Sequence, residues 1–401
     1  MEAQVEAGKV TVTAIAPSGA STGTFEALEL RDGGNRYSGK GVLKAVRNVR
    51  ELISPRLKGM DVTDLKAVDE AMRELDGTDN MGRLGGNATT AVSYAAAKAG
   101  AVLKGVELHE HLGQGSKVLP VPCMNVINGG KHAGGNLRVQ EFMVVPCGAP
   151  SFSEALRAGT EVYHALRQVL RKGMGPSAIN VGDEGGFAPP FDTSRQALDA
   201  LLRAIEAAGY APGKEVSLAM DAAASEFYSN GVYEVDGRRM APGEIVDFYI
   251  DLSKEYPLIS LEDPVHEEGF LDMAELTRKV GTRLQLVGDD LFVTNVDRLR
   301  RGIEAKAGNA MLLKVNQIGT VSDAMRAAAM CFDHGYNVMV SHRSGESEDT
   351  TIADIAVALE CGQIKSGAPA RAERTAKYNR LLRIEEGLGG KAVFKGRAAF
   401  L

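Results

Sequence analysis

Short apolar runs, repeated at intervals from Val118 onward, constrain this chain more than any other feature of its sequence. The runs are PVPCMNVI, EFMVV, VSLAM, LISLE, LQLVG, AMLLKV, NVMVS and QIKSG. Longer helical patterns separate them, and this alternation indicates parallel strands joined by crossover helices. Eight such runs within fewer than about 300 residues favour a closed (α/β)8 TIM-type barrel over an open sheet.

The segment that precedes these runs has a different pattern. EAQVE and VTVTAIAP lie on either side of Ala7 to Lys9 and predict a hairpin, which a glycine-bearing loop at Pro17 to Gly23 follows. Helical patterns then run through VLKAVRNVRELI, DLKAVDEAMREL and the alanine-rich NATTAVSYAAAKAGAVLKG. We therefore expect two domains, a smaller α+β N-terminal domain over residues 1–115 and a barrel domain over residues 116–401.

Charged side chains stand at or just past the ends of six of these runs. They are Asp221, Glu262, Asp289, Lys314, His342 and Lys365. After the first interval they follow one another at roughly 25-residue spacing, which is one strand plus one helix and its loops. Because the carboxyl ends of all barrel strands face one mouth, the six side chains should converge on a single site. The alternative is that each one merely makes a strand end polar.

Three of the six residues are carboxylates on successive strands. Asp221, Glu262 and Asp289 would repel one another and therefore need a cation, and oxygen ligands without histidine or thiol favour Mg²⁺ over Zn²⁺. Mn²⁺ accepts the same ligands, so the choice between the two ions stays open. The alternative is a set of acids that pair with nearby arginines.

Two lysines, Lys314 and Lys365, would share the mouth with this metal. A nearby positive charge lowers the pKa of a lysine, and the neutral amine can then serve as a general base. Removing a proton from carbon next to a carboxylate creates a doubly charged intermediate, which metal ions and fixed cations stabilise. A Lys or His base that works with one or two Mg²⁺ ions on an ene-diolate is an established pattern for such proton abstraction.

The overall composition argues against several classes of function. With 46 basic and 52 acidic residues the net charge is −6, and no basic run could follow a phosphate backbone, so nucleic acid is not expected as the main partner. No apolar stretch is long enough to span a membrane, and the start, MEAQVEAGKV, lacks the regions of a secretory signal. We therefore expect a cytoplasmic protein.

Long motifs throughout the chain resemble those of the enolase family. They are PSGASTG with EALELRDG, NGGKHAGG, VQEFMVVP, NVGDEGGFAP, SLEDP, DDLFVTN, LLKVNQIGT, VSHRSGESEDT and QIKSGAPARAER. The resemblance covers nearly everything from Ala3 to the C-terminus. It implies an enolase-type barrel with irregular first strands. The implied activity is the reversible, Mg²⁺-dependent dehydration of 2-phospho-D-glycerate to phosphoenolpyruvate, a hydro-lyase reaction of glycolysis and gluconeogenesis.

The resemblance also implies a role for each matching residue. Lys314 would be the base that removes the proton from carbon 2, and Glu184, supported by Glu141, the acid at the carbon-3 hydroxide. The resemblance implies that Asp221, Glu262 and Asp289 bind one Mg²⁺ and that Ser21 binds a second Mg²⁺, which substrate completes. Arg343 and Ser344 would bind the phosphate, and Lys365 would face the substrate carboxylate. Gln140 and the loop residue His132 would lie beside the substrate, and His342 is a further site position. A carboxylate such as Glu141 should raise the pKa of Glu184, so that Glu184 is protonated when the hydroxide leaves.

Two other functions are alternatives. An enzyme of the same superfamily with another substrate, such as an acid-sugar dehydratase or a racemase, would carry a Lys-x-Lys element, and none occurs between Val118 and Val145. The second alternative is a protein that keeps the fold with weak or no turnover and acts as a scaffold or a surface-binding protein. It would fit a secondary pool at the cell surface or outside the cell.

The resemblance is incomplete at the N-terminus. Members of the family begin with a further strand that carries an arginine-glycine-asparagine-proline turn, and this strand would precede the first residue of the chain. Its loss would leave an exposed edge on the N-terminal sheet. We therefore expect either an incorrectly assigned start or a true truncation in which the homodimer or higher homo-oligomer is weakened. Intact-mass and N-terminal analysis of the native protein distinguishes the two.

Overall fold

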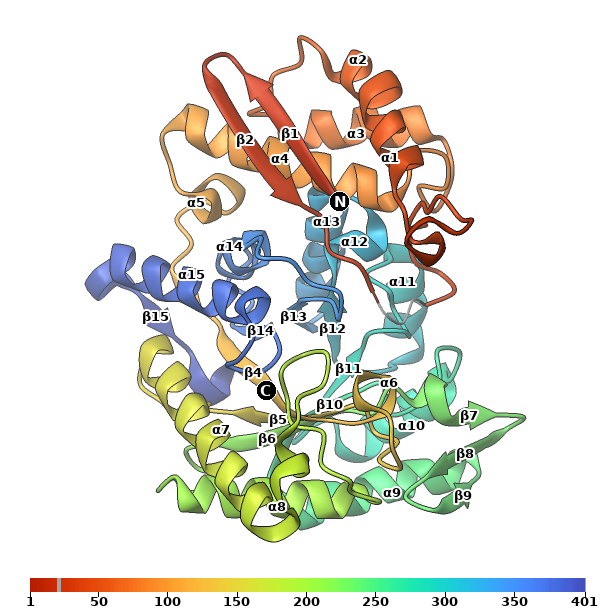
Figure 1. The fold of residues 1–401 in the computed structure, drawn as a ribbon, viewed down its shortest axis with the longest axis vertical. Helices are drawn as coiled ribbons and strands as arrows, with labels where there is room; N and C mark the ends of the chain where they lie inside the picture. Colours follow the sequence, from red (N-terminus) through yellow and green to blue (C-terminus); the bar gives the residue numbers. More distant parts are fainter. Residues whose placement is uncertain (20–22, 401) are drawn as a thin grey trace.

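The computed structural model describes residues 1–19 and 23–400, and Figure 1 shows their arrangement. The first element is the predicted hairpin, which is confirmed. Strand β1 (Glu2–Ala7) pairs antiparallel with β2 (Val10–Ile15), and Gly8 stands in the connecting turn at a φ of 62°. Ala3 and Ala14 are buried, because this face of the hairpin packs on helix α4.

Helices follow the hairpin, as predicted. They are α1 (Leu43–Asn48), a π-helical segment (Val49–Ile53), α2 (Ser54–Leu57), α3 (Leu65–Asp76), α4 (Gly86–Lys104) and α5 (Leu108–Leu112). The side chain of Asp64 caps α3 by accepting a hydrogen bond from the N–H of Ala67. The alanine-rich α4 is buried along most of its length, because its small side chains let the hairpin and the barrel side approach it closely.

In the described part of the chain, eight strands close into a barrel. In barrel order they are β10 (Leu258–Glu262), β11 (Gln285–Gly288), β12 (Ala310–Leu313), β13 (Asn337–Ser341), β14 (Gln363–Lys365), β4 (Val121–Asn128), β5 (Glu141–Val145) and β6 (Ser217–Asp221). Each of the eight apolar runs forms one of these strands. Buried side chains such as Val121, Met143, Val287 and Leu312 form a core of their own among the strands.

The expectation that all eight strands run parallel is wrong for β5. Strand β5 lies antiparallel to both of its neighbours, with Asn128 of β4 opposite Glu141 and with Val145 opposite Ser217 of β6. Only a short connection, which contains α6 (Gly130–Ala133), joins β4 to β5. A parallel crossover usually contains a helix long enough to return along the barrel, and the single turn α6 is too short for that, so the chain turns back instead.

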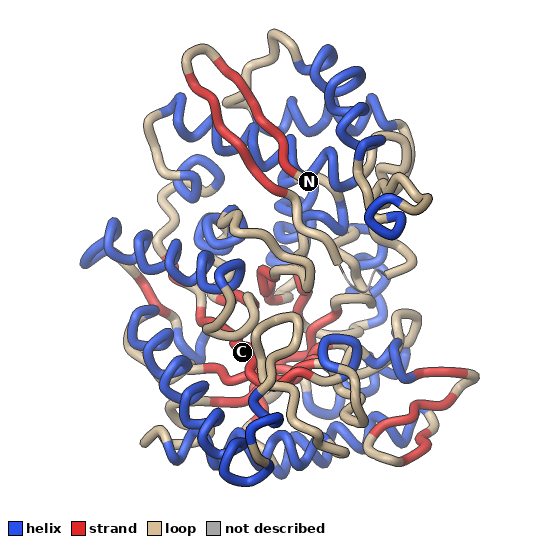
Figure 2. Tube along the Cα trace, in the orientation of Figure 1, coloured by secondary structure: helices blue, strands red, loops and turns tan. Residues whose placement is uncertain are grey.

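Helices surround the barrel, as Figure 2 shows. They are α7 (Phe152–Met174), α8 (Ser194–Ala207), α9 (Pro242–Glu255), α10 (Phe270–Val280), α11 (Val296–Ala305), α13 (Val321–Asp333), α14 (Thr351–Ala358) and α15 (Ala372–Leu388), with the single turn α12 (Val315–Ile318) after β12. A small sheet that the sequence did not predict consists of β7 (Tyr228–Ser229), β8 (Val232–Val235) and β9 (Arg238–Met240). Strand β3 (Val118–Leu119), near the start of the barrel domain, pairs parallel with β15 (Val393–Phe394), near its C-terminal end.

Candidate active site

The predicted strand-end residues converge at one end of the barrel. Glu141 lies opposite Asp221, and Asp221 lies opposite Glu262, so that three carboxylates stand side by side on β5, β6 and β10. Asp289 follows β11, and Lys314 directly follows β12. The barrel geometry therefore brings together groups that are far apart in the sequence.

Lys365, the last residue of β14, is the counter-ion of these carboxylates. Its Nζ lies 2.9 Å from Asp221 Oδ2, 2.9 Å from Glu262 Oε1 and 3.2 Å from Glu141 Oε2. Burial alone would lower the pKa of Lys365, but the surrounding carboxylates outweigh it and raise the pKa well above its usual value. Burial, and repulsion from Asp221, raise the pKa of Glu262. The cluster thus holds more negative charge than Lys365 alone neutralises.

Lys314 donates a hydrogen bond from Nζ to Asp289 Oδ2. The other carboxylate oxygen of Asp289 accepts a hydrogen bond of 2.8 Å from Gln317 Nε2. The sequence analysis predicts a lowered pKa for Lys314 beside a bound metal, whereas the protein groups alone have the opposite effect. Burial does lower the pKa of Lys314, but the charge of Asp289 outweighs burial and raises it.

Asp263 is a site residue that the sequence analysis missed. Its two carboxylate oxygens accept hydrogen bonds from the backbone N–H groups of Asp289 at 2.9 Å and Asp290 at 2.7 Å. Carboxylate oxygens of the three aspartates lie within 4.8 Å of one another. Asp263 has a φ of 41°, in the left-handed region that is costly for a residue with a side chain. This backbone conformation holds the strand end on which Asp289 stands.

Glu184 lies in the loop before α8 and is held by side chains from two barrel strands. Asn125 Nδ2 of β4 donates a hydrogen bond of 3.0 Å to Glu184 Oε2, and His342 Nε2, directly after β13, lies 3.3 Å from the same oxygen. The Nδ1 atom of His132 lies 3.7 Å from carboxylate oxygens of both Glu184 and Glu141. The predicted acid, its supporting carboxylate and the loop histidine are therefore adjacent.

The expected pKa order of the two glutamates is reversed. Burial, and the nearby charge of Glu184, raise the pKa of Glu141 well above its usual value. Burial would also raise the pKa of Glu184, but His342, His132 and Arg374 hold it well below its usual range. Burial lowers the pKa of His342 to about 3, so its ring is neutral at pH 7. Burial thus favours the neutral form of Glu141, whereas the neighbouring cationic groups favour the ionised form of Glu184.

Arg343 joins the barrel mouth to the loop that follows the hairpin. Its guanidinium donates to Glu26 Oε2 at 2.9 Å, to Glu26 Oε1 at 3.2 Å and to Asn316 Oδ1 at 2.9 Å. Ser18 and Gly345 form a β-bridge beside it, which anchors the start of the loop. Ser21, the predicted ligand of a second Mg²⁺, lies outside the described residues. Glu26 is a second residue that the sequence analysis missed, although it lies in the EALELRDG motif.

A buried arginine supports this side of the mouth. Arg374 Nη1 lies 2.6 Å from His342 Nδ1 and donates to the carbonyl oxygen of Arg343 at 2.6 Å, while Nη2 donates to those of Ser344 at 2.6 Å and Asp183 at 3.1 Å. One side chain of α15 thus fixes the segment after β13 and the loop of Glu184. Arg374 is a third residue that the sequence analysis missed, although it is the last residue of the QIKSGAPARAER motif.

A narrow cavity unites the predicted residues. It is lined by His132, Gln140, Glu141, Glu184, Asp221, Asp289, Lys314, Ser341, His342, Arg343, Ser344 and Lys365. Gln140 Nε2 lies 3.5 Å from Asp221 Oδ2. Except for Ser21 and Glu262, every predicted site residue borders this space, and Glu262 reaches the cluster through Lys365. The lining of this space therefore combines buried cations with a set of carboxylates.

The donor set of the mouth fits a divalent cation. Asp221, Glu262 and Asp289 are almost completely buried and offer hard oxygen ligands. Such ligands match Mg²⁺ or Mn²⁺ rather than Zn²⁺. Burial first, and then the charge of Asp221, raise the pKa of Glu262, and a bound cation would favour its ionised form.

Comparisons with known proteins identify the family of the chain. Residues 1–112 match the family model described as the enolase N-terminal domain, and residues 116–401 match the model described as the enolase C-terminal TIM barrel domain. Enolase from Methanopyrus kandleri is 58% identical over 403 residues, which cover 100% of this chain and 94% of that protein. Enolase from Methanocaldococcus jannaschii is 59% identical over 378 residues, which cover 94% of this chain and 88% of that protein. The chain therefore belongs to the enolase family.

Proposed function

We propose that this chain is a hydro-lyase that catalyses the reversible dehydration of 2-phospho-D-glycerate to phosphoenolpyruvate. The observation that carries the proposal is that Lys314, Glu184 and Arg343 line one cavity together with carboxylates able to hold a metal. The relatives named enolase, which match nearly the full chain, support the same activity. In this proposal the enzyme serves glycolysis and gluconeogenesis.

The substrate's phosphate would bind at the side of the cavity formed by Arg343 and Ser344. A guanidinium offers a planar pair of donors that matches phosphate oxygens, and a hydroxyl adds a short donor beside it. In the structure Glu26 engages this guanidinium, so phosphate binding requires Arg343 to exchange some of its contacts with Glu26. Lys365 would face the substrate carboxylate, with Gln140 and His132 beside the substrate.

Lys314 would take the proton from carbon 2. The lysine must be neutral for this step, and its pKa is raised by Asp289, so the base becomes active when another cation takes over the charge of that carboxylate. Mg²⁺, held by Asp221, Glu262 and Asp289, would supply that charge and would also stabilise the doubly charged intermediate. A second Mg²⁺ would be completed by substrate and by Ser21.

Glu184 would deliver a proton to the departing carbon-3 hydroxide. Its own pKa is low in the structure, whereas the neighbouring Glu141 has a raised pKa. The two carboxylates and His132 have ligand atoms within 4.8 Å of one another. His132 Nδ1 lies 3.7 Å from an oxygen of each glutamate, so a proton relay from Glu141 to Glu184 would require these groups to move into hydrogen-bond distance.

A scaffold or surface-binding protein without turnover is not favoured, because the described catalytic positions are complete and face one cavity. No described helix has both the length and the apolar character that crossing a membrane requires. A cytoplasmic location, a secondary pool at the cell surface or outside the cell, a homodimer or higher homo-oligomer, and the domain boundary at residue 115 stay predictions.

The direct test is to mix purified protein with Mg²⁺ and 2-phosphoglycerate and to record ultraviolet absorbance. The enol phosphate product absorbs where the substrate does not, so absorbance should rise and should stop rising when a chelator is added. A flat trace at high protein concentration would contradict the proposed activity. Repeating the assay with Mn²⁺ in place of Mg²⁺ would compare the two ions.

A further inference from the structure

Helix α15 places two buried cations against the loops that border the site. Arg374 and Lys377 stand one turn apart on this helix, and each side chain is only 1% exposed. Figure 1 shows α15 on the outside of the barrel, where it contacts α14 and α7. A charged side chain that is buried so deeply needs acceptors for its donors, and the acceptors differ between the two residues.

Four acceptors hold the guanidinium group of Arg374 in one orientation. Nη1 lies 2.6 Å from His342 Nδ1 and 2.6 Å from the carbonyl oxygen of Arg343. Nη2 donates to the carbonyl oxygens of Ser344 at 2.6 Å and Asp183 at 3.1 Å. Each terminal nitrogen carries two hydrogens and has two partners, so the guanidinium cannot turn away from the imidazole without leaving buried groups unpaired.

The contact with Arg374 determines which nitrogen of His342 carries a proton. A guanidinium has donors only and stays protonated in proteins, so His342 Nδ1 must be the acceptor and therefore carries no hydrogen. A neutral imidazole has one N–H group, which must then be at Nε2. His342 thus presents a donor to the cavity that it lines, and it offers no free acceptor there.

The charges around His342 agree with a neutral ring. Burial lowers its pKa to about 3, and the cations Arg374 and Lys365 lower it further, while Glu184 acts in the opposite direction. A second proton would have to bind Nδ1, where it would point at the guanidinium of Arg374. The geometry therefore prevents His342 from accepting a proton.

The fixed N–H group of His342 bears on one oxygen of Glu184. His342 Nε2 lies 3.3 Å from Glu184 Oε2, and Asn125 Nδ2 donates to the same oxygen at 3.0 Å. The described residues offer Nε2 no better-aligned acceptor. The other oxygen, Oε1, lies 3.7 Å from His132 Nδ1. A proton on Oε2 would face two N–H groups, so a protonated Glu184 should carry its hydrogen on Oε1.

We propose that Arg374 is a positioning residue that locks His342 in the tautomer with its proton on Nε2 and thereby assigns the acidic proton of Glu184 to Oε1. The consequence for Glu184 rests on the function proposed above. In that reaction the O–H bond at Oε1 breaks, its proton joins the hydroxyl group that leaves carbon 3 as water, and Glu184 becomes a carboxylate. His342 stays neutral throughout.

Lys377 offers a matched control, because it supports the same segment without touching the imidazole. Its Nζ donates to Glu346 Oε2 at 2.8 Å, and Glu346 Oε1 accepts a hydrogen bond of 3.2 Å from the N–H of Arg343. Lys377→Met therefore removes a buried cation of α15 and loosens the segment after β13, as Arg374→Met does. It should nevertheless leave Nδ1 of His342 without a hydrogen.

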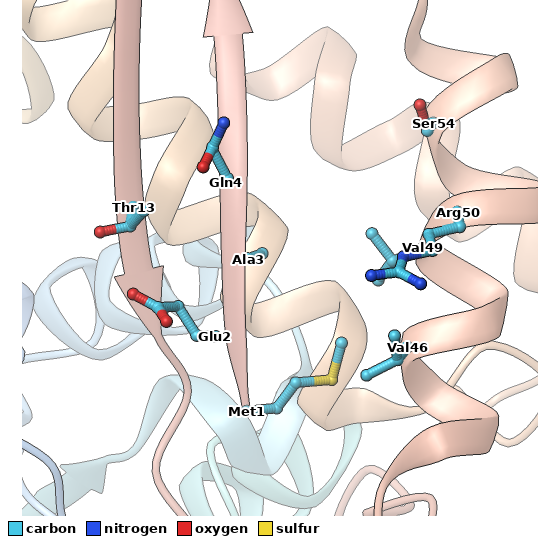
Figure 3. Close-up of a pocket in the computed structure, with 9 residues that line it drawn as sticks. All are labelled: Met1, Glu2, Ala3, Gln4, Thr13, Val46, Val49, Arg50 and Ser54. Carbon is cyan, nitrogen blue, oxygen red and sulfur yellow. The ribbon is translucent and has the colours of Figure 1, made fainter.

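Arg50 offers a control for the loss of an arginine elsewhere. It is exposed on the N-terminal domain, and Figure 3 shows its guanidinium extending from the helical segment toward β1. Arg50→Met should leave the state of His342 unchanged.

Two-bond ¹H–¹⁵N correlation spectra of the full chain with ¹⁵N-labelled histidine test the proposal, because they distinguish bare from protonated ring nitrogens. The chain has seven histidines, and the signals that disappear in His342→Gln identify His342. The unmodified protein should show a bare Nδ1 and a protonated Nε2 from about pH 5 to about pH 8. A proton on Nδ1, or on both nitrogens, would overturn the proposal without the need for any further variant to fold.

Arg374→Met should lose this single pattern, because a measurable fraction of His342 then carries its proton on Nδ1 and the ring signals move with pH. If Arg374→Met keeps the bare Nδ1, or if Lys377→Met or Arg50→Met loses it to the same extent, Arg374 does not set the tautomer and the proposal is wrong. The spectra need neither Mg²⁺ nor substrate. Their outcome is therefore independent of the ultraviolet assay, which tests the proposed activity separately.

Discussion

Every strand of the barrel is hydrogen-bonded on both sides, whereas β1 of the hairpin is paired on one side only. Closure of the barrel fixes the strand register, and the register places Glu141, Asp221 and Glu262 side by side. The hairpin contributes no side chain to the barrel mouth itself; its part of the site is the loop that carries Glu26. The comparison teaches that closure of a sheet can gather charged side chains from distant segments into one buried cluster, which a two-stranded hairpin does not do.

The largest effect should follow the loss of the buried counter-ion in the closed sheet. Lys365→Met leaves Asp221, Glu262 and Glu141 without the ammonium group that they share, and breaking such a buried pair should lower the free energy of unfolding by about 3–5 kcal/mol. Urea unfolding measures this loss in the free energy of unfolding. Lys254→Met removes an exposed ion pair with Asp251 and should change stability by less than about 1 kcal/mol. Similar losses in both variants would contradict the buried-charge account.

A smaller difference should separate packing in the two regions. Leu312 is completely buried among the barrel strands, so Leu312→Ala should destabilise the protein by about 3 kcal/mol. Val5 of the hairpin is only half-buried, and Val5→Ala should lower the free energy of unfolding by about 1 kcal/mol. Thermal unfolding of the two variants provides the measurement. An equal loss would mean that the hairpin is packed as tightly as the barrel.

The contact between helix α3 of the N-terminal domain and helix α13 of the barrel domain should depend on pH through Asp69 of α3. Burial raises the pKa of Asp69 to about 6, and its Oδ2 accepts a hydrogen bond from the N–H of Ser322 on α13. Because the folded pKa lies above the unfolded value, this group favours the folded state fully below about pH 4. That contribution, roughly 2–3 kcal/mol, is lost as pH rises through 6.

Asp69→Asn should remove that pH dependence and raise stability at pH 7, since a neutral amide can still accept the bond from Ser322. Unfolding free energies measured between pH 4 and pH 8 test this expectation. Asp79→Asn, at an exposed position, serves as the control. If the stability of the unmodified protein increased between pH 4 and pH 7 relative to Asp69→Asn, the assigned direction of the pKa shift would be wrong.

The sequence predicted the barrel strands well because apolar runs bounded by turns carry a strong signal. It did not predict the direction of β5, because EFMVV reads the same in either orientation. The signal was in the connection, since the glycine-rich segment between Asn128 and Glu141 carries no pattern of a crossover helix. The small sheet β7–β9 was missed because its strands are short and largely exposed.

The site was predictable where it depends on strand ends and family motifs, and less so where it depends on contacts between distant segments. Glu26 and Arg374 meet the segment after β13 from opposite ends of the chain. No spacing rule relates such positions. The pKa direction of Glu184 was wrong for the same reason, because it depends on which neighbours lie closest, and a list of nearby charges does not supply that information.

The division of proton transfer between Lys314 and Glu184 is the central claim, and exchange of the carbon-2 hydrogen of 2-phosphoglycerate in deuterated water tests it most directly. With Mg²⁺ present, Glu184→Gln should form product at least about a hundredfold more slowly but still exchange this hydrogen, because Lys314 is intact. Lys314→Ala should neither exchange it nor form product, while circular dichroism shows an unchanged fold. Lys66→Ala, at an exposed position on α3, should behave like the unmodified enzyme. Exchange by Lys314→Ala at the unmodified rate would contradict the assignment of Lys314 as the base.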